Sequence, residues 1–250
     1  VGRVLRLVLG YEFSCDTWVD DVHICGYNLD WDHPDLAEEV DAAKRSKTDA
    51  YHELCDRLTD AGLPVSWEED VLRYPALEGG IACRNPDAVQ RKHIFEAIAR
   101  RGHTESWSDA KILVRDDPAL NVKRRKIGAP EAIALIHRCG GTAILAHPFL
   151  IDETVMVGGT DPLSRKDYIE RLIEVGLDGI EASYTYDKTS YKGVLTPEEI
   201  EARVRQTYTN RVRFISGGSD YHADHKKGSK KVRCLAERGI SVEEFEAIFG

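Results

Sequence analysis

The chain has 250 residues, 42% of them hydrophobic, which is enough for one substantial domain or for one domain that carries an insertion. Its formal net charge of -9 argues against a general nucleic-acid binder, because polyanions bind basic surfaces, and we expect no stable nucleic-acid complex. No apolar run approaches the roughly 20 residues of a membrane span, so we expect no membrane association. Six scattered cysteines without a CxxC pair are typical of reduced thiols in a cytoplasmic protein.

The first predicted element is a strand that begins at the very start of the chain. The sequence opens on Val1 rather than Met, and its single methionine is Met156. The apolar run 4–9 has no turn or capping residue before it, so we expect the chain to be truncated at its amino terminus. The strand is predicted to continue to residue 14, and a second short strand follows at 21–27.

These two strands carry the first candidate metal ligands. Glu12 lies near the end of the first strand and His23 lies in the second, so the two side chains can converge on one metal across a hairpin. Taken singly, each residue also has a structural interpretation. Glu12 could be a solvated carboxylate at a sheet edge, and His23 could be a hydrogen-bonded core histidine.

A helical segment occupies the middle of the chain. Apolar residues recur at spacings of three and four between 35 and 62, and shorter helices are predicted near 67–74 and at 87–101. We take 44–130 as an all-helical module. Gln90–His93 begins the helix at 87–101, where backbone amides and the helix dipole favour an anion; a solvated basic helix end is the alternative interpretation.

After Pro130 the pattern changes to alternating helices and strands, which predicts a parallel sheet or a barrel. Helices are expected at 130–139, 164–175 and 197–208. They alternate with apolar strands that end near Ala146, Ser183 and Ile215.

Two of these strands are followed by residues of the types that commonly bind metals. His147 directly follows the strand at 143–146, and the strand at 212–215 is followed by a Gly-Gly turn and then by Asp220 and His222. Residues i and i+2 of an extended chain share a face, so Asp220 and His222 are predicted to point the same way. An Asp-x-His sequence in an ordinary turn is the alternative. Imidazole and carboxylate ligands without thiolate suit zinc, manganese or iron.

The other histidines are interpreted as structural or surface residues. His33, His52, His103 and His137 lie on predicted helices or loops. His225 follows the Asp220 motif closely, and we expect it to be a surface residue, with a role in substrate binding as the alternative.

At this point the chain resembles a known family, the PHP (polymerase and histidinol phosphatase) domain in its stand-alone metal-dependent phosphoesterase branch. The matching segments, in order, are YEFSC, VHICGY, RKHIFEAIARRG, GGTAILAHP and GGSDYH. The resemblance implies a distorted (β/α)7 PHP barrel formed by 1–43 and 131–250. It implies that 44–130 is a helical insertion that serves as a substrate cap.

The resemblance also implies a site with two or three divalent metal ions. Glu12 would bridge two metals, Asp220 would bind the second and His222 a third. His147, Asp220 and His222 would be catalytic, and the ligand set would be Glu12, His23, His147, Asp220 and His222.

The insertion would supply the substrate-binding residues. Arg91 and His93 match positions expected to hold a substrate phosphate, although the family's usual proline between them is Lys92 here.

One departure from the family limits this expectation. Family members open with a His-x-His strand, followed by an Asp and a further His, and none of these precedes Glu12 in this sequence. Only the set of Glu12, His23 and His147 is complete, which is enough for one metal. We therefore expect about one metal in this chain and an inactive or impaired fragment of an active parent.

For the intact parent we expect hydrolysis of a phosphomonoester of a small molecule or nucleotide, with attack by a metal-bridged hydroxide. A cyclic phosphodiesterase or a 3'-5' exonuclease would keep the same ligands and is the first alternative. A metal-dependent amidohydrolase is less favoured, because no candidate bridging lysine is found. A non-catalytic metal-binding or regulatory module is the third alternative. The sequence gives no indication of oligomeric state.

Overall fold

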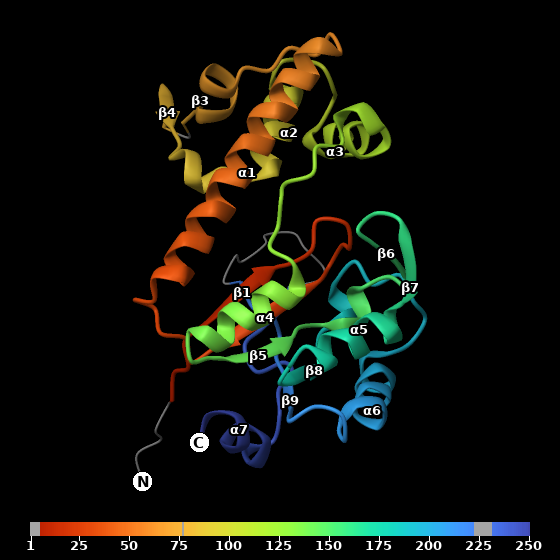
Figure 1. Ribbon diagram of the computed structural model, residues 1–250. Helices are drawn as coiled ribbons and strands as arrows, with labels where there is room; N and C mark the ends of the chain where they lie inside the picture. The colour runs from red at the N-terminus through yellow and green to blue at the C-terminus, as the bar shows by residue number, and fades with distance from the viewer. Residues whose placement is uncertain (1–5, 77, 223–231) are drawn as a thin grey trace. The chain divides into compact units, whose positions relative to one another are not determined.

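The computed structural model describes residues 6–76, 78–222 and 232–250 of the chain (Figure 1). It divides into two compact units, which we describe separately. The first unit consists of the described residues of Val1–Ala37 and Lys126–Gly250, and the second unit is formed by Glu38–Arg125. For comparison, the boundaries predicted from the sequence lay at 43/44 and 130/131. Helix α1 (Pro34–Asp60) begins in the first unit and continues through the second, past the predicted boundary at 43.

The first unit is organised by a mixed five-stranded sheet in the order β1-β2-β5-β8-β9. β1 (Gly10–Ser14), β2 (His23–Tyr27) and β5 (Thr142–Leu145) are antiparallel neighbours. β8 (Gly179–Ser183) and β9 (Phe214–Gly217) continue the sheet in parallel with β5. In this arrangement, the ends of β1, β5, β8 and β9 and the start of β2 lie at one edge of the sheet.

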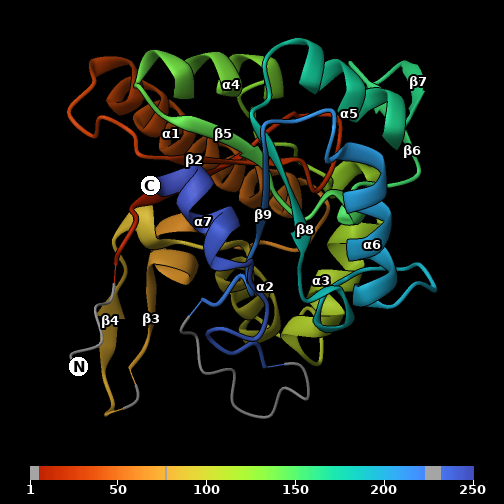
Figure 2. The same ribbon diagram turned by 90° about the horizontal axis from the view of Figure 1, so that it is seen from below.

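Amphipathic helices cover this sheet. α4 (Ala129–Arg138) packs against β2 and β5, α6 (Pro197–Tyr208) packs against β8, and α7 (Val242–Phe249) lies beside β9 (Figure 2). A Cβ atom at Gly26 would lie 2.9 Å from the Ile136 side chain, so glycine is needed for the close approach of α4 to β2. The helix α5 (Arg165–Glu174) packs against a separate hairpin of β6 (Thr154–Val157) and β7 (Asp161–Ser164). Short 3-10 turns, η4 (Pro148–Leu150) and η5 (Tyr186–Lys188), follow β5 and β8.

The second unit has its own hydrophobic core, in which the buried residues of α1 pack with those of α2 (Arg91–Arg100) and α3 (Trp107–Asp116). A single π-helical turn, η1 (Trp67–Leu72), and the 3-10 turns η2 (Pro86–Ala88) and η3 (Pro118–Leu120) complete its helical part. The unit also contains an antiparallel hairpin of β3 (Arg73–Pro75) and β4 (Ile81–Cys83). The prediction of an all-helical insertion therefore missed one hairpin.

The architecture is a mixed α/β fold. A (β/α)7 barrel needs seven strands, whereas the described residues contribute five to the main sheet. The predicted strand 4–9 falls partly outside the described residues, and regular strand structure begins at Gly10. None of the described helices combines the length and hydrophobicity needed to span a bilayer.

Candidate metal centre

The candidate centre lies at the edge of the sheet where β1, β5 and β8 end and β2 begins. In the β1/β2 register Glu12 pairs with Cys25, and His23 is two residues before Cys25 on the same face, so Glu12 and His23 are diagonal neighbours. The main chain after β5 extends the ladder, because the Ala146 N–H donates to the His23 carbonyl at 3.0 Å. His147, the next residue after Ala146, is therefore placed close to His23.

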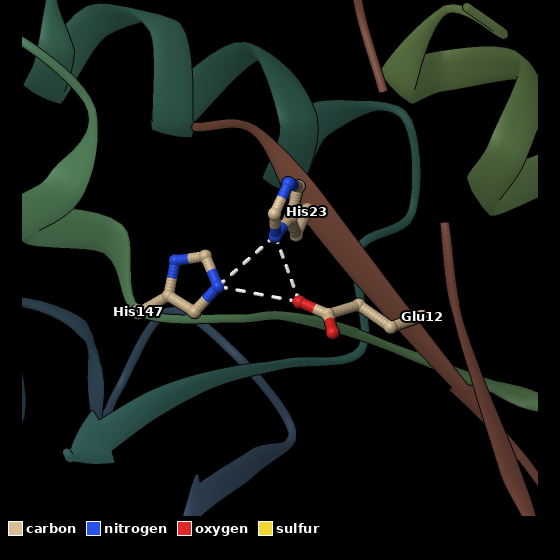
Figure 3. Close-up of side chains that lie close together, drawn as sticks. All are labelled: Glu12, His23 and His147. Atoms are coloured by element: carbon tan, nitrogen blue, oxygen red, sulfur yellow. Dashed lines mark hydrogen bonds and ion pairs between the residues drawn. The ribbon is translucent and has the colours of Figure 1, made fainter. Parts of the chain in front are cut away.

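Three donor atoms converge from these residues (Figure 3). His23 Nδ1 lies 2.8 Å from Glu12 Oε1 and 3.2 Å from His147 Nε2. His147 Nε2 lies 3.3 Å from Glu12 Oε1. Among the described residues, this is the group of His, Cys, Asp and Glu side chains whose ligand atoms are close enough together to hold a metal ion.

The separations of the donor atoms suit a divalent cation. Ligands about 2.1 Å from one ion, at angles between about 90° and about 109°, lie roughly 3.0–3.4 Å apart. The separations of 3.2 and 3.3 Å fall in this range, and the third, 2.8 Å, is slightly shorter. The donor set is two imidazoles and one carboxylate, which suits zinc, manganese or iron and leaves coordination positions open for other ligands. Ser14 Oγ lies 3.4 Å from His23 Nε2, the ring nitrogen that keeps its proton when Nδ1 binds a metal.

The His147 side chain is held rigidly at the end of β5. Its backbone has a φ of 29°, a left-handed value that is strained for a residue with a side chain. The Glu181 carboxyl, from β8, accepts a hydrogen bond from the His147 N–H at 2.7 Å. The imidazole is 4% exposed and packs against the Tyr184 ring, with 5.0 Å between the ring centroids. Its Nδ1 is buried and has no hydrogen-bond partner among the described residues.

The two carboxyl groups near the centre have pKa values shifted in opposite directions. Hydrogen bonds with His147 and His23 hold the pKa of Glu12 well below its usual range, although partial burial opposes them. Burial raises the pKa of Glu181 to about 8; Asp220 and Glu12 add to this effect, and the hydrogen bond from His147 opposes it. In the metal-free protein at neutral pH, Glu12 is therefore a carboxylate and Glu181 holds a proton.

Asp220 and His222 follow β9 but are outside the three-residue cluster. Asp220 Oδ2 accepts hydrogen bonds from the Tyr184 hydroxyl at 3.0 Å and from Arg233. The exposed His222 ring donates from Nδ1 to the Asp220 carbonyl at 2.9 Å. Their roles as metal ligands and catalytic residues remain predictions. His225 lies outside the described residues.

Arg91 and His93 are in the second unit, at the start of α2. The His93 Nδ1 accepts a hydrogen bond from the Gln90 N–H at 3.1 Å, and Arg91 donates to the Val122 carbonyl at 3.4 Å. Burial and the nearby Arg84 lower the pKa of His93. Their role in binding a phosphate remains a prediction.

Sequence reasoning missed Glu181, Tyr184 and Arg233. The signal for Glu181 was present, because it is the single charged residue in the otherwise apolar or small strand Gly179–Ser183. An acid in such a strand is costly to bury unless it has a partner, so it marks a candidate functional position.

The other four predicted structural or surface histidines have ordinary environments. His33 accepts the Asp35 N–H near the start of α1, and His52 packs against the Trp67 ring. His103 lies 3.2 Å from the Pro64 carbonyl, and His137 pairs with Asp178 at 2.7 Å.

Comparison with curated proteins finds relatives over part of the chain. A 5'-3' exoribonuclease Rnm from Escherichia coli is 30% identical over 149 residues, which is 59% of this chain and 47% of that protein. The enzyme of the same name from Salmonella typhimurium is 28% identical over the same shares. A 5'-3' exoribonuclease from Haemophilus influenzae is 26% identical over 60% of this chain and 51% of its own length. The chain thus spans about half the length of these relatives. No family model matches.

Comparison with solved structures finds the same fold in larger proteins. A protein assigned as a metal-dependent phosphoesterase from Bifidobacterium adolescentis aligns with a TM-score of 0.63 and 22% identity, over 98% of this chain and 76% of its own. An amidohydrolase from Chromobacterium violaceum, crystallised with sulfate and without metal, aligns with a TM-score of 0.58 and 22% identity, over 86% of this chain and 67% of its own. At this identity the likeness shows the fold alone.

Proposed function

We propose that this chain carries the site of a metal-dependent hydrolase that cleaves phosphoester bonds. The observation that carries the proposal is the convergence of Glu12 Oε1, His23 Nδ1 and His147 Nε2 within 3.3 Å of one another. Two imidazoles and a carboxylate bind the divalent metals that support phosphoester hydrolysis. The phosphoesterase-like fold and the exoribonuclease relatives support the same class of reaction.

For the substrate we propose the end of an RNA strand. The sequence favoured a phosphomonoester of a small molecule or nucleotide, with a 3'-5' exonuclease among the alternatives. Three curated relatives are named 5'-3' exoribonucleases, and this supports a 5' RNA end over a small molecule or a 3' end. A net charge of -9 does not oppose this substrate, because an exonuclease needs only a local basic surface to hold its strand.

The chain's own residues have distinct roles in this proposal. A bound divalent metal supplies Lewis acidity and lowers the pKa of water. Glu12 and His23 fix the ligand geometry from a rigid hairpin, and Glu181 holds the strained backbone of His147 so that its Nε2 faces them.

Two further pairs of residues have proposed roles, one pair in each unit. We propose that Asp220 and His222 contribute to a second metal position, and that Arg91 and His93 bind the phosphate. The Arg91 guanidinium would neutralise charge on the phosphoryl oxygens.

Metal content is the decisive first measurement. Inductively coupled plasma mass spectrometry on the wild-type chain is expected to find about one zinc, manganese or iron per chain, lost in His147→Ala. His137→Ala is the matched control, because His137 pairs with Asp178 outside the cluster. Hydrolysis of a 5'-phosphorylated oligoribonucleotide is then assayed with each metal added. A folded wild type that binds none of these metals would refute the proposed site.

A further inference from the structure

A second candidate binding surface lies in the second unit and shares no residue with the metal centre. A cavity of about 510 Å³ opens between the hairpin β3–β4 and the helices α2 and α3. Its lining includes Tyr74 and Arg84 from the hairpin region, Glu96 and Arg100 from α2, and Trp107 from α3. We call this surface the Tyr74/Trp107 hollow.

Two aromatic side chains line this hollow. Trp107 is the first residue of α3 and is 45% exposed, although it is large and apolar. Tyr74 is the central residue of β3 and is half-buried, with the Arg84 guanidinium 3.8 Å from its ring centroid. An exposed tryptophan beside a second aromatic ring offers flat apolar area on which another planar group can stack.

Three cations lie beside these rings or line the same cavity. Lys92 Nζ lies 5.4 Å from the centre of the Trp107 ring, and Arg84 lies over Tyr74. The exposed Arg100 lines the same cavity and donates to the Asp70 carbonyl. The acid nearest to these cations in the hollow is Glu96, 3.5 Å from Lys92 and 3.8 Å from Arg84. The Asp70 carboxylate also lies near Arg100, so three cations accompany two carboxylates, which is still a local excess of positive charge in a chain whose net charge is -9.

We propose that the Tyr74/Trp107 hollow binds single-stranded nucleic acid. Bases stack on the Trp107 and Tyr74 rings, and Arg100 and Lys92 neutralise the backbone phosphates. This is the combination by which proteins hold single strands without reading their sequence, because every base has a flat π-face and every linkage carries a negative charge. Glu96 adds an acceptor for an exocyclic amine of a stacked base.

The proposal rests on the proposed function for the identity of the nucleic acid as RNA. It assigns the helical unit a role in holding the strand, in addition to the phosphate contacts proposed for Arg91 and His93. A protein partner could also pack against an exposed tryptophan, but such packing does not require three cations at the same hollow. Charge complementarity therefore favours the polyanion.

The first test is a binding experiment without turnover. The affinity of the full chain for a fluorescent single-stranded RNA of about a dozen nucleotides is measured by anisotropy in EDTA, so that hydrolysis does not contribute. Trp107→Leu is expected to weaken binding about tenfold, since leucine has no flat aromatic face on which a base can stack. Trp107→Phe keeps an aromatic face and should retain most of the affinity. Trp31→Leu is the matched control, because Trp31 is also 45% exposed but lies in the first unit.

The second test measures the charge contribution. Arg100→Gln should lower the slope of log affinity against log salt by roughly 0.7, the value for one phosphate contact on a single strand. Arg115→Gln is the control, because Arg115 is an exposed cation of α3 that pairs with its neighbour Asp116. Circular dichroism of every variant checks folding.

The outcomes separate this inference from the proposed function. Wild type that does not bind RNA, or Trp107→Leu that binds as tightly as Trp31→Leu, would overturn the hollow as a nucleic-acid site even if RNA is hydrolysed. Trp107→Leu that binds no worse than Trp107→Phe would show that stacking is not the mode of contact. RNA binding that depends on Trp107, in a chain that hydrolyses no RNA with any metal, would support the hollow and refute the proposed function.

Discussion

Glu181 offers the sharpest test of how the metal centre is held in place. It contributes no donor atom to the three-residue cluster, yet it accepts the hydrogen bond of the His147 N–H at 2.7 Å. Glu181→Leu removes this acceptor, whereas Glu181→Gln keeps a carbonyl oxygen at the same position. The glutamine is also neutral, as Glu181 is in the metal-free chain at pH 7, where its pKa is about 8. The pair of variants therefore separates the hydrogen bond from the charge.

The expected size of the effect follows from two local energies. A buried N–H without an acceptor costs about 1–3 kcal/mol. The left-handed backbone of His147 stores strain of the same order, about 1–3 kcal/mol, which the surrounding contacts must hold. Without Glu181 the backbone is expected to relax and to turn Nε2 away from Glu12. Loss of such an outer partner typically lowers metal affinity about 10- to 100-fold.

The assay is competition for Zn²⁺ or Mn²⁺ between the protein and a fluorescent chelator, at pH 7. We expect Glu181→Leu to bind the metal about 10- to 100-fold more weakly and Glu181→Gln to stay close to wild type. Thermal unfolding of the metal-free variants shows whether each is folded. A folded Glu181→Leu with wild-type metal affinity would refute the reasoning, because the hydrogen bond to His147 would then have no part in placing the ligand.

Two further predictions concern the second unit. Arg91→Ala should chiefly raise KM for a phosphorylated substrate while kcat changes little, because Arg91 is proposed to act in binding. Steady-state kinetics measures this, with Arg115→Ala as the control. An unchanged KM would show that Arg91 is only a solvated residue at the helix end. Burial raises the pKa of the Cys55 thiol to about 12 from its ordinary 9.0, so the folded chain keeps a proton that the unfolded chain loses as pH rises between these values. This contribution to stability is complete below about pH 9 and is lost as pH rises towards 12, by about 1.4 kcal/mol per pH unit. Urea unfolding at about pH 8 and about pH 10.5 should show a steeper loss for wild type than for Cys55→Ala, and equal losses would contradict the assignment.

The parts of the site that the sequence could predict are those that depend on local periodicity. The two-residue period of a strand places Glu12 and His23 on one face of a hairpin, and a buried run that stops at His147-Pro148 marks a strand end. Both signals are visible within about ten residues. The convergence of the three donor atoms follows once β2 pairs with β5.

The parts that could not be predicted depend on contacts between distant segments. The Glu181 carboxyl accepts the hydrogen bond of the His147 N–H from 34 residues away, and no local sequence pattern indicates which backbone N–H a partly buried acid will pair with. The ion pair of Asp220 with Arg233 likewise joins two loops.

The domain boundary predicted at 43/44 does not coincide with an end of helix α1. Lys44 and Lys47 lie within a helix that continues to Asp60, because charged side chains on a solvated helix face do not interrupt the backbone hydrogen bonds.

The long sequence separation within the metal centre affects how the protein folds. Glu12 and His147 are 135 residues apart, and 124 residues separate His23 from His147. Closing loops of this length is slow, so the donor atoms meet only after much of the first unit has formed. A metal ion that needs all three donors would then contribute after the folding transition state. Metal binding would therefore slow unfolding far more than it accelerates folding, and it would increase the kinetic stability of the chain.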